Sequence, residues 1–271
     1  MNVIKNQKSK IKNCLFFLMA SCILLSSSVV NAQTNTRLKV LCYNLRFGEL
    51  ASLEELATFI EEQDPDVVAL QEVDVRTNRP AAPHQNGLDF ITELGFRTGM
   101  LPAYGKTIPH LGGYYGIGIL SKYPMSSIRR VYLPHPVADG SREQRAVLVA
   151  DIEYADNQYF TFAVTHLDNS NTEVRQAQVA RINEILKARQ HPVIIAGDFN
   201  AIPSSTEISE GMSDWKPLCN SDPTFPANNP NRKIDYIFCF PKDRWEEVQT
   251  QTMTDVQLSD HLPVSAEVEL K

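Results

Sequence analysis

The sequence is poor in the residues that build several common kinds of site. It has five cysteines and six histidines in 271 residues, without a CxxC pair or a cysteine–histidine spacing typical of structural zinc. It also lacks a GxSxG nucleophile elbow, an HExxH helix and a Walker lysine loop. These absences argue against a zinc scaffold, a zinc protease, a serine hydrolase and a P-loop enzyme.

The first 32 residues have the layout of a secretory signal peptide. A basic head without acidic residues precedes an apolar run from Leu15 to Val30, and Val30-Asn31-Ala32 forms a small-x-small cleavage site. We therefore expect cleavage after Ala32, export to the periplasm or the medium, and a single domain over residues 33–271.

Two alternatives to a cleaved signal remain open. A membrane anchor would need about 20 apolar residues, whereas this run is shorter and is interrupted by serines. A lipoprotein would be tethered through Cys22, but Ile23 to Leu25 continue the apolar run where a polar tether would be expected.

Without residues 1–32 the chain has 239 residues, with 22 basic and 32 acidic side chains and hence a net charge of −10. This charge disfavours long nucleic acid as a partner, since such binding depends on neutralising phosphates. Three cysteines remain, of which Cys42 lies in an apolar run, while Cys219 and Cys239 could pair. We expect a monomer without a membrane span.

Hydrophobic periodicity predicts an α/β protein with many strands. Residues 37–45, a helix behind the Ser52 capping box and a strand at 67–70 form a strand–helix–strand start, and 74–86 is expected to be loop. A short helix is expected at 88–94, ended by Gly95, and a long one from 171 or 172 to 189. Because regular alternation fails in the middle, two mixed sheets packed together with helices outside fit better than one doubly wound sheet.

Polar residues occur at six places in or beside the predicted strands: most follow a strand, Asp235 lies inside one, and Asp260-His261 precedes the last one. They are Asn44, Gln71-Glu72, His166, Asp198 with Asn200, Asp235, and Asp260-His261. Taken singly, each is also explained as a turn former or a satisfied core residue. Asp235 is harder to explain that way, because a carboxylate inside the apolar KIDYIF strand needs a partner. Together they predict one convergent site.

Carboxylates with an asparagine, without cysteine, suit a hard cation such as Mg²⁺ or Mn²⁺. Two histidines with spare carboxylates allow Asp–His acid–base pairing. Divalent-metal-assisted hydrolysis of a phosphate ester is the reaction class that remains.

The sequence resembles the endonuclease/exonuclease/phosphatase superfamily in seven motifs: YNLR (43–46), LQEV (70–73), YGIGILSKYP (115–124), THLD (165–168), GDFN (197–200), KIDYIF (233–238) and SDHLPV (259–264). The resemblance spans residues 38–270 and is closest to exported bacterial members. It implies a four-layer α/β sandwich, with two mixed β-sheets packed face to face and helices outside, and a divalent metal.

The resemblance also implies a role for each residue that matches a family motif. Glu72 is expected to be the principal metal ligand beside Asn44, and Asp260 to bind or position metal or water. Asp198 would activate the attacking water, and Asn200 would hold a phosphate oxygen. The phosphate would also meet two imidazoles, His166 and His261, of which the second is held by Asp235.

Weaker substrate contacts are expected at Arg46, Tyr115 and Arg145, for which ion pairing or packing is the alternative. The favoured hypothesis is that the protein is a phosphodiesterase or phosphatase that acts on a small or lipid-linked phosphate. The alternatives are a secreted nuclease, whose groove would use scattered cations, and a non-catalytic binding protein. Trp215 and Phe225 are the candidates for a membrane-docking loop. The cations of that groove would be Arg129, Arg130, Arg142, Arg145, Arg175, Arg232 and Lys233.

Overall fold

A computed structural model describes residues 36–135 and 143–271. The predicted signal peptide, Cys22 and Arg142 lie outside the described residues. Among the residues described, no helix is both long enough and apolar enough to cross a membrane.

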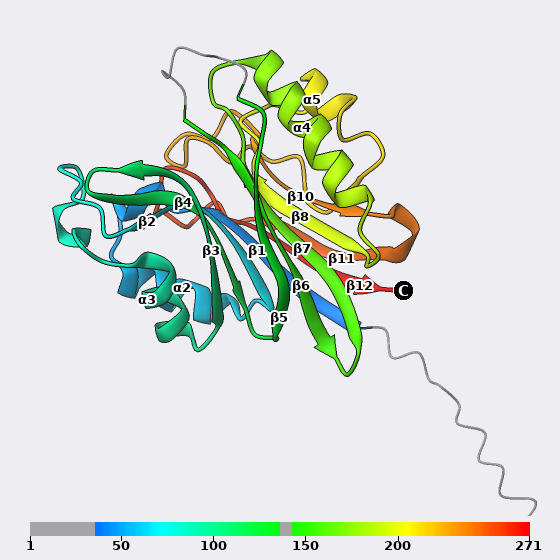
Figure 1. Ribbon diagram of the computed structural model, residues 1–271, viewed down its shortest axis with the longest axis horizontal. Helices are drawn as coiled ribbons and strands as arrows, with labels where there is room; N and C mark the ends of the chain where they lie inside the picture. Colours follow the sequence, from blue (N-terminus) through cyan, green and yellow to red (C-terminus); the bar gives the residue numbers. More distant parts are fainter. Residues whose placement is uncertain (1–35, 136–142) are drawn as a thin grey trace, which may run out of the picture. The chain divides into compact units, whose positions relative to one another are not determined.

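Two six-stranded sheets form the centre of the fold (Figure 1). The first has the order β11-β12-β1-β2-β4-β3 and the second β5-β6-β7-β8-β10-β9. Both are mixed, because β1–β2 and β7–β8 are parallel pairs among antiparallel neighbours. The strands of the first sheet are β1 (Thr36–Asn44), β2 (Val67–Val75), β3 (Leu101–His110), β4 (Gly113–Ser121), β11 (Trp245–Thr252) and β12 (Val264–Leu270). Those of the second are β5 (Met125–Tyr132), β6 (Ala146–Ala155), β7 (Gln158–His166), β8 (Val193–Asp198), β9 (Lys216–Pro217) and β10 (Asp235–Phe240).

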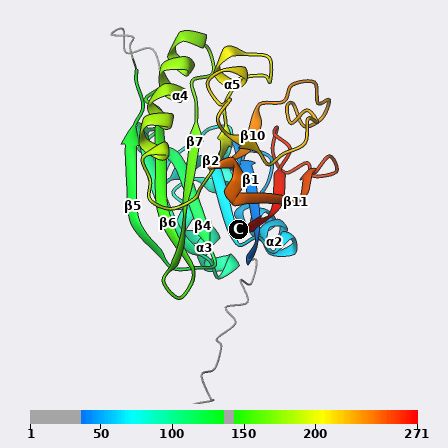
Figure 2. The ribbon, with the colours of Figure 1, turned by 90° about the vertical axis from the view of Figure 1, so that its right-hand side faces the viewer.

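The sheets pack face to face through one apolar core. Val40 and Ile119 of the first sheet belong to the same buried cluster as Phe162 and Ile237 of the second. Helices cover the outer faces, with α2 (Leu53–Gln63) and α3 (Phe90–Thr98) on one side and α4 (Thr172–Lys187) and α5 (Thr206–Ser209) on the other (Figures 1 and 2). The predicted four-layer sandwich is confirmed.

Local signals explain where the longer helices begin. The Ser52 side chain accepts from the Glu55 backbone N–H, and the Glu55 carboxylate accepts from the Ser52 backbone, which completes the expected capping box. Asn171 caps α4 by accepting from the Val174 N–H. Short 3-10 turns lie at Arg46–Gly48, Pro83–Gln85 and Lys242–Arg244.

Two predicted boundaries are wrong. Helix α3 continues through Gly95 and ends at Gly99, whose φ of 67° is the left-handed conformation typical of a helix end. Gly95 is needed for close packing instead, because a Cβ there would lie 2.9 Å from the Met100 carbonyl oxygen. Strand β2 extends to Val75, so the expected loop begins later than residue 74.

Strand β3 was missed because Pro102, Gly105 and Pro109 interrupt its pattern. It lies at the edge of its sheet and pairs only with β4, and an edge strand tolerates proline because one side needs no ladder bonds.

The 201–232 stretch does not present Trp215 for membrane docking. Trp215 is 2% exposed, packs on Phe240 and donates its indole N–H to Asn183. Phe225 is half-buried against the ring of His261. Within the described ranges, Cys42, Cys219 and Cys239 are free thiols, so the open Cys219–Cys239 pairing is absent.

Candidate active site

The ends of strands from both sheets meet at one edge and bring the predicted residues together. In the second sheet, Asp198 of β8 is the register partner of both His166 on β7 and Asp235 on β10. In the first, Asn44 at the end of β1 pairs with Gln71, beside Glu72. These ends surround a cavity of about 410 Å³.

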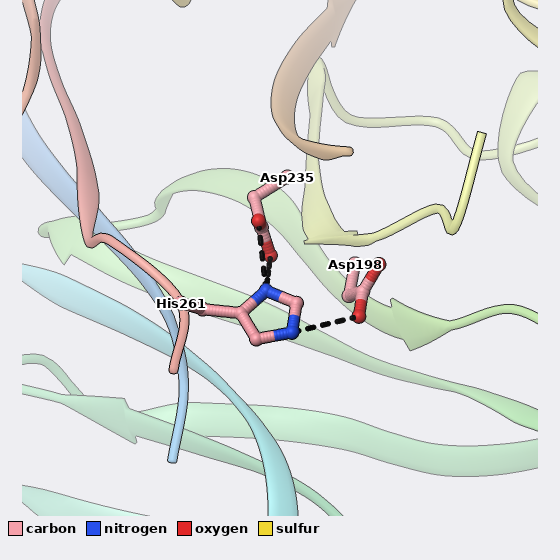
Figure 3. Close-up of side chains that lie close together, drawn as sticks. All are labelled: Asp198, Asp235 and His261. Atoms are coloured by element: carbon pink, nitrogen blue, oxygen red, sulfur yellow. Dashed lines mark hydrogen bonds and ion pairs between the residues drawn. The ribbon is translucent and has the colours of Figure 1, made fainter. Parts of the chain in front are cut away.

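Asp235 and His261 form a buried pair (Figure 3). Nδ1 of His261 lies 3.0 and 3.2 Å from the two Asp235 carboxylate oxygens, so this nitrogen carries the proton and donates it. Burial alone lowers the pKa of His261, but the nearby carboxylates, Asp235 first among them, outweigh burial and raise it. The carboxylate inside the KIDYIF strand therefore has the partner that its burial requires.

Asp198 lies at the centre of the group. Its Oδ2 is 3.2 Å from Asn44 Nδ2, 3.4 Å from His166 Nε2 and 3.8 Å from His261 Nε2. Its Oδ1 accepts the backbone N–H of Asn200 at 2.8 Å. Burial first, and then the neighbouring Asp235 carboxylate, raise the pKa of Asp198 above its ordinary value, which brings this carboxylate closer to the range of a useful base.

Gly197 allows Asp198 to approach His166. A Cβ at Gly197 would lie only 2.1 Å from the Thr165 carbonyl oxygen on β7. The two strands can therefore lie this close only with glycine at this position.

His166 is a neutral imidazole. Burial, together with the positive charges of Arg145 and His261, lowers its pKa well below the ordinary histidine value. At neutral pH its ring can therefore donate or accept a hydrogen bond without carrying charge.

Asn44 connects the two sheets. Its Nδ2 donates to Glu72 Oε1 at 3.3 Å as well as to Asp198, while its Oδ1 accepts the Arg46 backbone N–H at 3.0 Å. Glu72 occupies an irregularity in the β2–β4 pairing and has a φ of 55°. Such an irregularity re-aims a side chain, and here Glu72 lines the cavity instead of continuing the ladder.

Asn200 also has a left-handed backbone, with a φ of 50°, and lines the cavity. One N–H of its side chain donates to the Leu167 carbonyl at 3.1 Å, which fixes the amide beside the THLD loop.

Arg46 is placed differently from the other predicted residues. It forms ion pairs with Glu49 and Asp260 and lines an adjoining cavity of about 350 Å³ rather than the one around Asp198. Asp260 borders both cavities. The Asp260 carboxylate therefore has a cationic partner of its own.

Tyr115 and Arg145 both line the main cavity and are nearly buried. Arg145 is 4% exposed and contacts Glu143 through NH2 at 3.2 Å. Its Nε has no hydrogen-bond partner among the described residues.

Sequence reasoning assigned no role to several residues of the cavity wall. The signal for one of them was present, because Asp74 is a second carboxylate in an apolar strand and its partner, Arg79, follows five residues later. The unassigned wall residues are Phe47, Arg79, His110, Glu143 and Asn169, whereas Phe225 was predicted for membrane docking and Arg232 for a nucleic-acid groove.

The donor set fits a hard divalent cation. Within the described residues, the Glu72 carboxylate accepts a side-chain hydrogen bond only from the neutral Asn44 amide. Burial raises its pKa in spite of the nearby positive charges of His261 and Arg145, so a cation would relieve its desolvation. The ligand atoms of Asp198, Asp235 and His261 also lie within 4.8 Å of one another. However, His261 Nδ1 is occupied by Asp235, which suits proton handling better than ligation.

Two sheets with a base, a paired imidazole and oxygen ligands at their shared edge define the class of the protein, a metal-dependent phosphoester hydrolase. The sequence model of the Endonuclease/Exonuclease/phosphatase family matches residues 41–261. The chain belongs to this family.

Curated relatives agree with this membership. The uncharacterized protein YbhP of Escherichia coli strain K12 is 28% identical over 254 residues, which cover 86% of this chain and 96% of YbhP. Exodeoxyribonuclease III of Haemophilus influenzae is 27% identical over 191 residues, which cover 66% of this chain and 63% of that enzyme.

Solved structures share the fold. An endonuclease/exonuclease/phosphatase protein from Beutenbergia cavernae has a TM-score of 0.73 at 20% identity, covering 86% of this chain and 72% of its own. A mannosyl-6-phosphatase of Bacteroides thetaiotaomicron has a TM-score of 0.65 at 17% identity, covering 85% and 99%. The catalytic domain of human Nocturnin has a TM-score of 0.64 at 17% identity, covering 87% and 95%.

Proposed function

We propose that this chain is an exported phosphodiesterase or phosphatase that acts on a small or lipid-linked phosphate ester with the help of Mg²⁺ or Mn²⁺. The observation that carries the proposal is the position of Asp198, a buried carboxylate of raised pKa between a neutral and a protonated imidazole.

In this reaction the water oxygen bonds to phosphorus while the bond from phosphorus to the leaving oxygen breaks. Asp198 accepts the proton that the water loses, and the leaving oxygen departs as an anion that solvent water protonates. The Asp235 carboxylate keeps His261 protonated, and His261 Nε2–H donates to a phosphoryl oxygen as negative charge grows on it. His166, being neutral, contributes a hydrogen bond rather than a proton. The Asn200 amide orients a further phosphoryl oxygen.

Glu72 and Asn44 would hold the cation, with Asp260 as a third oxygen ligand or a ligand through water. For Asn44 this requires its amide oxygen to turn into the cavity. The cation supplies charge neutralisation and polarisation of the phosphate ester.

A small substrate fits the cavity better than a polymer. Its volume is about 410 Å³, within the ordinary range of small-molecule sites. The cations proposed for a nucleic-acid groove are dispersed: Arg175 pairs with Glu207, Lys233 is buried, and of the others described only Arg145 and Arg232 line this cavity.

A secreted nuclease is the second candidate, favoured by the match to exodeoxyribonuclease III. The test is a parallel assay of purified 33–271 protein with Mg²⁺ or Mn²⁺ on bis(4-nitrophenyl) phosphate, 4-nitrophenyl phosphate and plasmid DNA. EDTA and Asp198→Ala serve as controls. Hydrolysis of a nitrophenyl ester that is lost both in EDTA and in Asp198→Ala supports the proposal. Rapid nicking of the plasmid favours the nuclease, and no activity on any of the three substrates favours a binding protein.

Export is the remaining part of the proposal, and it rests on the composition of residues 1–32. Intact-mass analysis of the protein recovered from a periplasmic or culture-medium fraction should give a chain that begins at Gln33. A diacylglycerol-modified chain that begins at Cys22 would indicate a lipoprotein instead.

A further inference from the structure

The cavity that contains Tyr115 of β4 is also lined by Arg79, from the loop after β2, and by Arg145, which hydrolysis as derived above does not use. Arg79 is held by the buried Asp74 carboxylate, which accepts from its Nε at 2.5 Å and from NH2 at 3.1 Å. The guanidinium also lies 3.9 Å from the centre of the Phe47 ring and 5.3 Å from that of Tyr115. The Asp74 carboxylate accepts from two of the five N–H groups of the Arg79 guanidinium, so the other three remain available to a ligand.

Arg145, immediately before β6 of the second sheet, lines the same cavity as Arg79 and Tyr115. Its positive charge acts on the Tyr115 hydroxyl, as that of Arg79 does. Arg145 is 4% exposed, and its Nε has no partner within residues 36–135 and 143–271. Because Nε itself is closed to solvent, Arg145 acts on a ligand in the cavity through the positive charge of its guanidinium group.

His110 completes this wall. Its ring lies 6.1 Å from the Tyr115 ring, and its buried Nε2 is likewise without a partner in the described part of the chain. Arg79 therefore keeps N–H groups free for a ligand, Arg145 adds positive charge, and His110 lines the same cavity. The same cavity is also lined by Glu72, Asp198 and Asp260, which suit a cation.

The aromatic rings of the cavity support these cations. Phe47 lies under Arg79, and Phe225 contacts both Arg232, at 4.7 Å, and the His261 ring. These contacts help to hold the positive charges in place at the cavity.

We propose that Arg79, Arg145 and His110 form a second anion subsite, so that the substrate is a phosphate ester with a further phosphate or carboxylate group. This inference rests on the proposed function, since it concerns the part of the substrate that is not hydrolysed. Guanidinium groups held by Asp74 and Glu143 are preorganised for charge-assisted bonds to such a group.

The test measures binding of non-hydrolysable probes by calorimetry in Mg²⁺. The probes are propylphosphonate, 3-phosphonopropionate and propane-1,3-bisphosphonate, which differ in whether their second end is apolar, a carboxylate or a phosphonate. We expect wild-type protein to bind at least one of the doubly anionic probes at least about tenfold more tightly than propylphosphonate. Tighter binding of 3-phosphonopropionate would indicate a carboxylate as the second group of the substrate, and tighter binding of propane-1,3-bisphosphonate would indicate a phosphate.

Arg79→Gln should reduce the ratio of affinities for the doubly anionic probe and propylphosphonate to near one. Arg97 is an exposed arginine that pairs with Glu93, and Arg97→Met should preserve the ratio. Because Arg79→Gln leaves Asp74 buried without its partner, the double variant Asp74→Asn/Arg79→Gln provides a second version with a neutral pair. A wild-type ratio below about twofold overturns the subsite, as does a folded Arg79 variant that keeps the wild-type ratio.

Hydrolysis of bis(4-nitrophenyl) phosphate and 4-nitrophenyl phosphate is measured in parallel. If the protein hydrolyses a nitrophenyl ester but binds all three probes equally, the subsite is overturned and the proposed function stands. If it prefers a doubly anionic probe but hydrolyses neither ester, the subsite is supported and the proposed hydrolysis is contradicted.

Discussion

The carboxylate of Asp235 lies 3.0 Å from Nδ1 of His261, and both side chains are almost completely buried. The pair joins the second sheet to the loop before β12. It leaves His261 Nε2 directed at Asp198, 3.8 Å away (Figure 3). The aspartate thus sets both the tautomer and the charge of the histidine that faces the phosphate in the proposed reaction.

Asp235→Asn should lower kcat by about 100-fold or more, because an amide stabilises neither the protonated imidazole nor its tautomer. Steady-state kinetics on the preferred 4-nitrophenyl ester measure this. Asp151→Asn is a matched control, because Asp151 is a buried aspartate on β6 that pairs with Arg189 and lies outside the cavity. A loss of kcat as large in the control as in Asp235→Asn would refute the assignment.

Gly197→Ala should lower both stability and kcat. The added methyl group would lie 2.1 Å from the Thr165 carbonyl, so β7 and β8 must separate and Asp198 must move away from His166. We expect a loss of about 1–3 kcal/mol in the free energy of unfolding and a fall in kcat of tenfold or more.

Gly105→Ala is the comparison for Gly197→Ala. This glycine also lies in a strand, and its Cβ would approach Ile117 and Leu148 in the core at 3.1–3.2 Å, away from the cavity. It should destabilise the protein while kcat stays within about twofold. If Gly197→Ala behaves in the same way, the close approach at Gly197 serves packing alone.

Glu72→Gln should weaken metal binding by at least about tenfold, because it removes the negative charge of the principal oxygen donor. Titration of metal-free protein with Mn²⁺, followed by calorimetry, measures affinity without depending on turnover. Glu54→Gln, at an exposed position of α2, should bind Mn²⁺ like the wild type. Unchanged Mn²⁺ affinity in Glu72→Gln would move the cation to another donor set, with Asp198 and Asp235 as the next candidates.

In EDTA, stability should fall as the pH rises above neutrality. Burial lowers the pKa of His261, but the Asp235, Asp198 and Asp260 carboxylates outweigh it and raise the pKa from 6.5 to about 10. Because the folded state holds this proton more tightly than the unfolded chain, its stabilisation is complete below about pH 6.5 and disappears towards pH 10.

Urea unfolding of wild type and His261→Gln at several pH values isolates this contribution. We expect the wild-type advantage to shrink by roughly 1–3 kcal/mol between pH 6.5 and 9.5. An advantage that stays constant or grows over this range would show that His261 is not held protonated.

The sequence by itself determined the family, the sandwich and most of the site. GDFN and THLD each end a buried strand and SDH precedes one, so local hydrophobic patterning was enough to place their polar residues beside strand ends. Capping signals at Ser52 and Asn171 were equally readable, because a helix cap depends on residues three positions apart. Family membership then related these ends to one chemistry.

The tertiary structure alone decided which distant side chains meet. Arg46 pairs with Asp260, 214 positions away, instead of lining the main cavity, and Trp215 packs inside instead of being presented for docking. Arg79, after β2 of the first sheet, and Arg145, before β6 of the second, line one cavity together with Tyr115. Edge strand β3 lacked a readable pattern, because its position at the edge is what makes its prolines acceptable. Such features depend on contacts between remote segments, for which local spacing carries no information.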